Sequence, residues 1–257
     1  MDGYLLGVSD VKLFAKDYFS KNAKGTVIVV PEFGASCANY DYFASLLSER
    51  LNVFLYDQRG QGKSEGVFSL DSAVSDLEKI VDSKNEPVAL CAHSFGSRVA
   101  IDVAKRYEQQ GRPLLGVYLI QPCLGVESFG HKNGNASLSW VKSKLSGKKN
   151  PLIVQVADLS VNDCVLEKTP AGYMIASKDD ALFISEHDVV CQAKKFHALF
   201  KNRFVGIDWN DSHEVKELGH WLNFSNGAPL LKEESGKNAE EIARRISYFF
   251  LRVFEKN

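Results

Sequence analysis

The chain has 257 residues, of which 45% are hydrophobic and 25% are charged, a composition typical of a globular domain with a substantial core. Its formal net charge is −1, so the overall charge favours neither nucleic acid nor a membrane surface as a partner. The five cysteines are scattered without CxxC or CxH spacing, which argues against a disulfide framework or a zinc site.

The N-terminal residues, MDGYLLGVSD, have neither a basic start nor an apolar segment. No apolar run in the chain approaches the length that spans a bilayer. We therefore expect neither a signal peptide nor a transmembrane helix, and we predict a cytoplasmic protein.

Short apolar runs that alternate with helical patterns predict the strands. They lie at residues 26–30, 52–56, 87–91, 116–120 and 172–176, with a further strand near 203–207. The first run, TVIVV, is continuous and β-branched, which is typical of a strand covered on both faces.

Three segments between and after these strands show helical periodicity. The periodic residues are Leu70, Val74, Leu77 and Val81, then Val99, Val103 and Tyr107, and finally Ile242, Ile246, Phe249 and Val253. The last helix is predicted to start at Asn238, because Glu241 three residues later matches a capping box.

Strands that alternate with helices predict an α/β fold with a mainly parallel sheet flanked by helices, and ligand sites at the carboxyl ends of the strands. We predict one domain over residues 1–257. Residues 123–171 show no clean strand–helix repeat, so we interpret them as a small cap or lid inserted between two strands.

The segment PVALCAHSFGS, at residues 87–97, points to a nucleophile. An apolar strand runs into Ser94 and then into a helix, with Ala92 and Gly96 two positions to either side. This is the G-x-S-x-G elbow with alanine in the first small position. The helix N-terminus would offer free N–H groups to a developing oxyanion, and the backbone N–H of Phe95 is the first expected donor.

The segment before the elbow resembles that of α/β-hydrolases, most of all the monoacylglycerol lipase and lysophospholipase group. Residues 56–64, YDQRGQGKS, match that group's D-x-R-G-x-G-x-S loop, and QPCLG at 121–125 resembles its motif after the sixth strand. The likeness extends over residues 26–125 and recurs near 173–180 and 218–224. Residues 56–64 lack Walker spacing, so we interpret them as a structural loop near the elbow rather than a phosphate site.

The resemblance also implies the rest of a catalytic triad. Gly219-His220-Trp221-Leu222 resembles the family's G-H-x-L motif, which makes His220 the expected base. The acid should follow the strand at 172–176, and with Ser177 in the family's glycine position it falls on Asp180.

Alternatives to these two residues stay open. The acid could be the adjacent Asp179 or the more distant Asp188, and His220 could simply be packed in the C-terminal loop. His93 precedes the serine on the turn, so its side chain should point elsewhere.

The loop after the first predicted strand should supply the second oxyanion donor. Relatives have His-Gly-x-Gly there, whereas this chain has Pro31-Glu32-Phe33-Gly34, which assigns the role to the backbone N–H of Phe33. Glu32 either points away and pairs with a basic group, or helps to bind a polar or cationic group of the substrate. Phe33, Phe95 and Trp221 either line an acyl pocket or serve the core.

The predicted cap is basic. Between Ser128 and Ala157 it contains no acidic residue but five lysines: Lys132, Lys142, Lys144, Lys148 and Lys149. Either this segment meets an anionic lipid surface or a phosphate-bearing head group, or it is an ordinary solvated face.

Together these features predict a serine hydrolase that cleaves a small-molecule carboxylic ester through an acyl-enzyme, with no metal, organic cofactor or nucleic acid involved. The resemblance implies a mono-acyl lipid ester such as a monoacylglycerol or a lysophospholipid. The alternatives are a thioesterase, a small-ester esterase, or a non-catalytic protein that binds a ligand with the same fold.

Overall fold

The computed structural model describes residues 2–120, 122, 164–174 and 234–255. The strand predicted near 203–207 and most of the predicted cap lie outside these ranges. The described residues comprise the first half of the chain, one later strand and the C-terminal helix.

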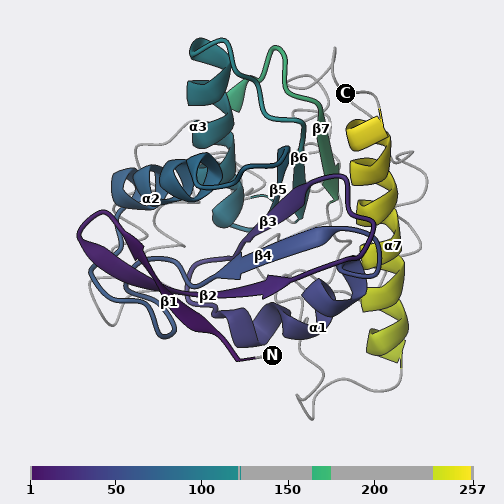
Figure 1. Ribbon diagram of the computed structural model, residues 1–257, viewed down its shortest axis with the longest axis horizontal. Coiled ribbons are helices and arrows are strands. Elements are labelled where there is room, and N and C mark those ends of the chain that lie inside the picture. The colour runs from purple at the N-terminus through teal and green to yellow at the C-terminus, as the bar shows by residue number, and fades with distance from the viewer. Residues whose placement is uncertain (1, 121, 123–163, 175–233, 256–257) are drawn as a thin grey trace, which may run out of the picture.

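The described residues form a seven-stranded sheet with strand order β1-β2-β4-β3-β5-β6-β7 (Figure 1). The strands are β1 (Tyr4–Val8), β2 (Val11–Tyr18), β3 (Thr26–Val30), β4 (Asn52–Tyr56), β5 (Val88–His93), β6 (Val117–Ile120) and β7 (Ala171–Met174). From β4 to β7 all neighbours pair in parallel, whereas β2 is antiparallel to both β1 and β4. The predicted mainly parallel α/β sheet is confirmed.

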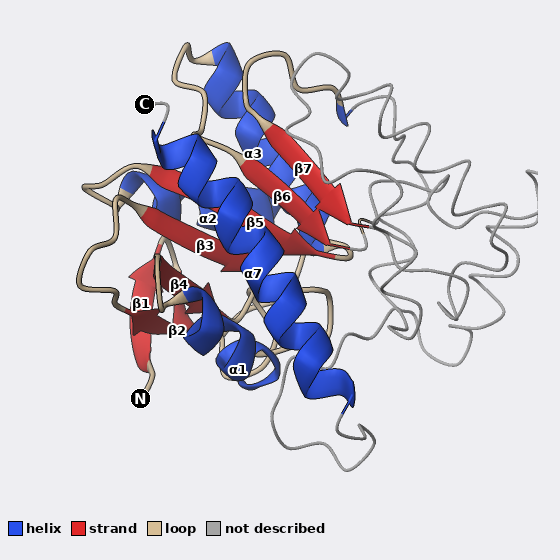
Figure 2. Cartoon of the chain, turned by 90° about the vertical axis from the view of Figure 1, so that its right-hand side faces the viewer, coloured by secondary structure: helices blue, strands red, loops and turns tan. Residues whose placement is uncertain are grey.

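Helices cover both faces of this sheet (Figure 2). One face bears α1 (Cys37–Leu47) and α7 (Glu234–Glu255), and the other bears α2 (Leu70–Asp82) and α3 (Gly96–Gln109). The residues of β3 are all buried: Val27 and Val29 pack on the α1/α7 side, whereas Ile28 and Val30 pack on the α2/α3 side. A strand between two helical layers needs apolar side chains on both faces, which is why TVIVV is continuous.

The two helices of the α2/α3 layer follow their predicted periodicity. Val74, Leu77 and Val81 of α2 are buried against the sheet, and Ser69 caps its N-terminus by accepting a hydrogen bond from the backbone N–H of Ser72. In α3 the predicted apolar stripe, which begins at Val99, is likewise buried.

Two parts of the sequence analysis need correction. The C-terminal helix begins at Glu234 rather than at Asn238, so the capping-box pattern lies inside the helix, and residues 234–237 add a further turn. The N-terminal hairpin of β1 and β2 was not predicted. Its burial alternates, with Leu13 and Ala15 at 0% exposure between partly exposed neighbours, so it lacks a continuous apolar run.

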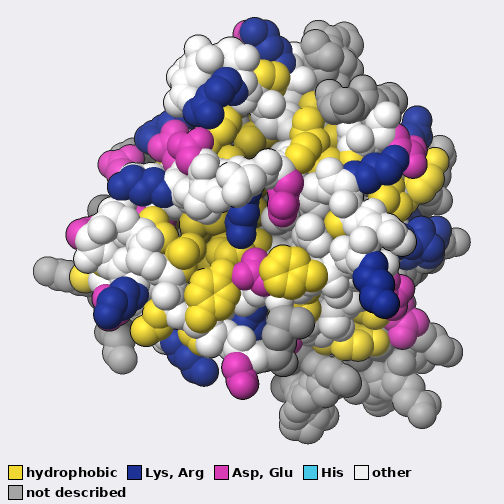
Figure 3. All heavy atoms as spheres, in the orientation of Figure 1, with side chains coloured by type: hydrophobic (Ala, Val, Ile, Leu, Met, Phe, Trp, Pro, Cys, Tyr) yellow, Lys and Arg dark blue, Asp and Glu magenta, His cyan; other side chains and the backbone are white. Residues whose placement is uncertain are grey.

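The surface of the described residues has mixed charge. On the face in Figure 3, Lys and Arg side chains are interspersed with Asp and Glu, and hydrophobic side chains are exposed between them. Of the helices described, none combines the length and hydropathy needed to cross a bilayer.

Candidate active site

Ser94 lies on the turn that joins β5 to α3, as the elbow pattern predicts. Its φ is 50°, and among the described residues other than glycine only Ser9 shares a positive φ. Such a backbone conformation costs on the order of 1–3 kcal/mol and persists only where the surroundings impose it. The backbone N–H of Ser94 donates to the carbonyl of Ile120 in β6 at 2.9 Å, so the sheet itself holds the turn.

The small residues around Ser94 are required by close packing. A Cβ added at Gly96 would collide with the carbonyl oxygen of Pro31 and lie 2.6 Å from that of Val30. Ala92 is fully buried. The elbow therefore packs directly against the start of the loop at residues 31–34, which is the predicted oxyanion loop.

In the predicted oxyanion loop, two backbone N–H groups have side-chain acceptors and a third has none among the described residues. Glu32 N–H donates to Tyr40 Oη at 3.1 Å, and Gly34 N–H donates to Gln61 Oε1. Pro31 has no N–H, and its carbonyl accepts from Gln58 Nε2 at 2.6 Å. No described residue accepts a hydrogen bond from the N–H of Phe33, and its role as an oxyanion donor stays a prediction.

Phe95 is the second predicted donor. It is the N-cap residue of α3, and its N–H has no acceptor among the described residues. Its ring is only 2% exposed and belongs to an aromatic cluster, since Phe68 lies 6.1 Å from Phe95 and 5.0 Å from Phe33 between ring centroids. The Phe95 side chain is thus part of the core, whereas its N–H lies at the helix N-terminus.

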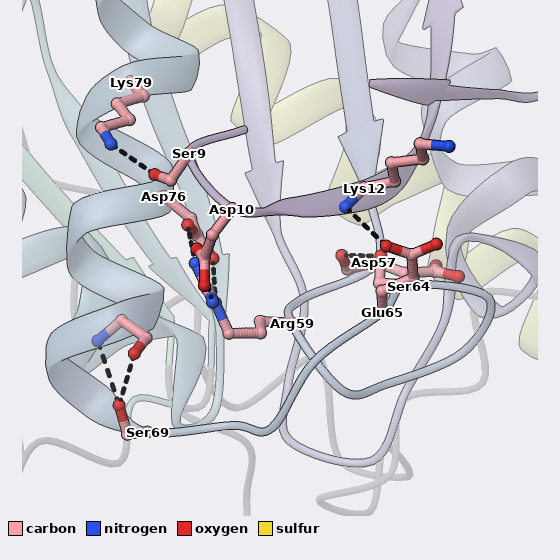
Figure 4. Close-up of polar contacts among 11 residues, drawn as sticks. Ser9, Asp10, Lys12, Asp57, Arg59, Ser64, Glu65, Ser69, Asp76 and Lys79 are labelled. Atoms are coloured by element: carbon pink, nitrogen blue, oxygen red, sulfur yellow. Dashed lines mark hydrogen bonds and ion pairs between the residues drawn. The ribbon is translucent and has the colours of Figure 1, made fainter. Parts of the chain in front are cut away.

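The loop with the D-x-R-G-x-G-x-S pattern is a structural support, as predicted. Asp57 accepts from the N–H of Cys37 at the start of α1 at 2.5 Å, and from the N–H of Lys63 at 2.7 Å. Ser64 Oγ donates to the carbonyl of Asp57 at 2.6 Å and accepts from the N–H of Phe14 at 2.9 Å. These bonds join the loop to α1 and to β2, and Figure 4 shows the bond between Ser64 and Asp57 within the loop.

Arg59 joins the same loop to α2 (Figure 4). Its Nε and Nη2 bind the two carboxylate oxygens of Asp76 at 2.9 and 2.7 Å, and Nη1 binds Asp10 at 3.1 Å. Asp76 is 1% exposed and its hydrogen bonds raise the pKa of Arg59, whereas Asp10 is largely exposed. Sequence reasoning missed both partners, because they lie 17 and 49 residues away and no local pattern marks them.

A buried polar cluster lies beside the elbow. His93, the residue before Ser94, is 1% exposed, and its Nδ1 is 2.8 Å from Tyr40 Oη on α1. This contact with α1 agrees with the prediction that the His93 side chain does not point toward the Ser94 hydroxyl. Glu32 is 8% exposed, and its Oε1 lies 3.9 Å from His93 Nδ1, beyond hydrogen-bond distance.

The Glu32 carboxyl group lacks the partners that a buried charge requires. Its Oε2 is buried without a hydrogen bond to any described residue. Burial raises the pKa of Glu32 to about 8, because desolvation disfavours the carboxylate. The sequence pointed to Glu32 as unusual but gave no sign of Tyr40 and His93 as its neighbours.

The strand that precedes the predicted acid is β7, at the end of the described sheet. β7 pairs in parallel with β6, so both strands and β5 end at the same edge as Ser94. Glu108 of α3 accepts from the backbone N–H groups of residues 167–169 at 2.9, 2.9 and 2.6 Å, which fixes the approach to β7. Although burial opposes it, these bonds lower the pKa of Glu108.

The other predicted site residues lie outside the described residues, so their roles stay predictions. They are Asp180 with its alternatives Asp179 and Asp188, His220, Trp221 and the five cap lysines. In the ranges that the structure does describe, no three His, Cys, Asp or Glu side chains are grouped in a way that could hold a metal ion.

Comparison with known proteins places these features in context. A model of the family described as serine aminopeptidase, S33 matches residues 21–163. A proline iminopeptidase of Saccharolobus solfataricus is 26% identical over 132 residues, which are 45% of this chain and 42% of that protein. The aligned region thus spans less than half of the length of that relative.

Solved structures resemble the chain over nearly its whole length. A putative lipase from Acinetobacter baumannii AYE matches with a TM-score of 0.67 at 15% identity, covering 100% of this chain and 93% of that one. Est1E from Butyrivibrio proteoclasticus, solved with ferulic acid bound, matches with a TM-score of 0.67 at 14% identity, covering 98% and 99%. At such low identity these likenesses concern the fold alone.

Proposed function

Because the chain belongs to the serine aminopeptidase S33 family, we propose that it is a serine hydrolase that cleaves a carboxylic ester through an acyl-enzyme on Ser94. Its fold is the α/β-hydrolase fold that the sequence predicts. The observation that supports the proposal most is the strained conformation of Ser94, with φ of 50°, on a turn packed against the loop that contains Phe33.

In the proposed mechanism, Ser94 Oγ attacks the ester carbonyl while His220 accepts its proton, and Asp180 orients the imidazole. The N–H groups of Phe33 and Phe95 stabilise the oxyanion of the tetrahedral intermediate. His220 then gives the proton to the leaving alcohol. Water, deprotonated by His220, attacks the acyl-enzyme to form a second tetrahedral intermediate. Its collapse breaks the bond to Ser94 Oγ, which takes the proton back from His220 as the acid is released.

For the substrate we propose a mono-acyl lipid ester. The support is the likeness of residues 56–64 to the loop of monoacylglycerol lipases and lysophospholipases. A thioester or a short-chain ester would suit the same machinery.

A second candidate is removal of an N-terminal residue from a peptide. It is favoured by the matched family and by the similarity to a proline iminopeptidase. The same nucleophile and base can cleave an amide, so the two candidates differ in leaving group rather than in mechanism.

The basic segment around Lys142 to Lys149 suggests how a lipid substrate would be approached. We propose that it makes peripheral contact with anionic lipid.

A substrate panel tests the function. It contains p-nitrophenyl esters from short to long chains, a monoacylglycerol, a lysophospholipid, an acyl thioester and proline p-nitroanilide. We expect kcat/KM to be highest for a mono-acyl ester. Preferential cleavage of the anilide would favour the peptidase instead, and failure of a fluorophosphonate probe to label Ser94 would favour a non-catalytic ligand-binding protein.

A further inference from the structure

Three elements bring a carboxyl group, a phenol and an imidazole together under the predicted oxyanion loop. Glu32 comes from the loop itself, Tyr40 from α1, and His93 from the end of β5. Tyr40 Oη accepts from Glu32 N–H at 3.1 Å and lies 2.8 Å from His93 Nδ1. The cluster therefore couples the loop that contains Phe33 to the residue that precedes Ser94.

The carboxyl group of Glu32 is the unusual member. It stands where the family resemblance predicts glycine, it is 8% exposed, and its Oε2 has no hydrogen bond to any described residue. A buried carboxylate with an unpaired oxygen is costly, whereas the neutral acid avoids most of that cost. The environment thus favours a protonated Glu32.

The groups that surround Glu32 in the described structure offer little compensating positive charge. Tyr40 on α1 and Cys91 on β5 are buried, and burial raises the pKa of each, so both stay neutral. The side chains that reach the loop from residues 57–64 are the uncharged amides of Gln58 and Gln61. Asp57 of that segment is an acid whose oxygens accept backbone N–H groups.

His93 is the basic group beside the carboxyl. It is in hydrogen-bond distance of Tyr40 rather than of Glu32. Because Tyr40 Oη already accepts from Glu32 N–H, its own proton is available for His93 Nδ1. In that arrangement Nδ1 carries no proton, so this atom offers no hydrogen bond to the Glu32 carboxyl.

We propose that Glu32 is a positioning residue that gates the reaction by its protonation: Ser94 reacts while the Glu32 carboxyl is neutral, and reaction stops when that proton is released to solvent. This inference rests on the proposed function. The carboxylate would lie one residue from Phe33, whose N–H is the predicted oxyanion donor. A negative charge there opposes the charge that develops in the transition state, and low local polarity strengthens that effect.

The gate predicts a particular pH dependence. Burial raises the pKa of Glu32 to about 8, so the neutral fraction falls above that pH. If only the neutral form supports reaction, the rate should fall roughly tenfold for each further pH unit.

The experiment follows the rate at which a fluorophosphonate probe labels Ser94 in the full chain between about pH 6 and pH 10, with the site confirmed by mass spectrometry. This readout needs no knowledge of the natural substrate. The variants are Glu32→Gln, which keeps the shape but cannot ionise, and Glu49→Gln as a matched control at an exposed glutamate. The quantity compared is the ratio of the labelling rate at about pH 7 to that at about pH 9.

We expect a ratio of about 10 in the wild type and in Glu49→Gln, and a ratio near 1 in Glu32→Gln. Equal ratios in all three proteins, with Ser94 labelled, would overturn the gate and leave the proposed function intact. No labelling of Ser94 in any protein at any pH would overturn the proposed function and the gate with it.

Thermal unfolding over the same pH range gives an independent readout. The pKa of Glu32 is higher in the folded chain than its ordinary value of 4.5, so its contribution to stability is complete below about 4.5 and is lost as pH rises to about 8. Wild-type Tm should therefore decrease relative to that of Glu32→Gln across this window. Parallel Tm curves would mean that the pKa of Glu32 is the same in the folded and unfolded chain, so that its carboxyl is already ionised at about pH 6, which would also overturn the gate.

Discussion

Two backbone hydrogen bonds hold the main chain of Ser94 in its conformation. Its N–H bonds to Ile120 in β6, and its carbonyl accepts from the N–H of Ser97 at 3.0 Å in the first turn of α3. A glycine would adopt φ of 50° at lower cost, so a serine at this position carries a conformational strain that glycine would avoid.

Gly96→Ala tests the contact between the elbow and the oxyanion loop. The added Cβ meets the backbone carbonyls of Val30 and Pro31, which cannot rotate away as a side chain could. We expect the free energy of unfolding to decrease by about 1–3 kcal/mol. Turnover should fall by about 100-fold, since a shift of about 1 Å in a catalytic group costs that much.

Chemical denaturation and ester kinetics measure these two effects. If the variant keeps wild-type stability and turnover, residues 31–34 do not pack as tightly on the elbow as the structure indicates.

Asp180→Asn and Asp179→Asn test the proposal that Asp180 orients His220. An asparagine at the acid position holds the imidazole in the wrong tautomer and lowers kcat by about 10⁴-fold in a triad. We expect that loss for Asp180→Asn and a far smaller one for Asp179→Asn, by steady-state kinetics. The reverse order would shift the assignment by one residue.

At the scale of elements, the loop at residues 57–65 fastens three parts of the fold together. Asp57 binds the N-terminus of α1, Ser64 binds β2, and Arg59 binds α2 and the hairpin turn. The oxyanion loop packs against the same segment through Gln58 and Gln61. The glycine-rich sequence therefore supports the candidate site through these structural contacts.

Asp76→Ala and Asp10→Ala separate the buried and exposed halves of the Arg59 network. Removing Asp76 leaves a buried guanidinium without its two-oxygen partner, which costs about 3–5 kcal/mol in buried ion pairs. Asp10 is 76% exposed, so its removal should leave the unfolding midpoint unchanged. Urea unfolding compares the two, and equal effects would mean that burial does not determine the strength of this network.

The sequence predicted best the strands with a continuous apolar run and the helices with a regular apolar periodicity. The strands at 26–30 and 52–56 match β3 and β4, and the other described strands of the prediction lie within two residues of their expected bounds. The hairpin of β1 and β2 was not predicted, because a half-exposed antiparallel strand has no continuous apolar run.

For the whole molecule, the parallel sheet explains why the candidate site lies where it does. Strands β3, β5, β6 and β7 all end at one edge, which brings residues 31–34 and Ser94 together from distant parts of the chain. That juxtaposition could be predicted from the elbow motif and strand order. The Glu32–Tyr40–His93 cluster could not, because it depends on which face of α1 meets the end of β5.

We predict that the basic cap contacts anionic lipid, and this prediction concerns how the whole molecule approaches a lipid substrate. Replacing Lys142, Lys144, Lys148 and Lys149 by Gln should weaken activity on anionic vesicles, since each lysine near such a surface contributes about 1 kcal/mol. Activity on a soluble short ester should not change. Lys21→Gln with Lys24→Gln, at exposed positions outside the cap, is the control.

Salt gives a second test of the same proposal. The difference between vesicle and soluble activity should shrink at high ionic strength, because salt screens exposed charges. Equal losses on vesicles and on the soluble ester would assign the lysines a structural role.

The central claim is that Ser94 is the nucleophile, and the most direct test is kcat for the preferred ester in Ser94→Ala and Ser97→Ala. Ser97 is a buried serine three residues away in the first turn of α3, and its Oγ donates to the carbonyl of Ala92 at 3.3 Å. We predict that Ser94→Ala lowers kcat by on the order of 10⁴-fold or more with the fold intact, whereas Ser97→Ala stays within about tenfold of wild type. Near-wild-type turnover by Ser94→Ala would contradict the account.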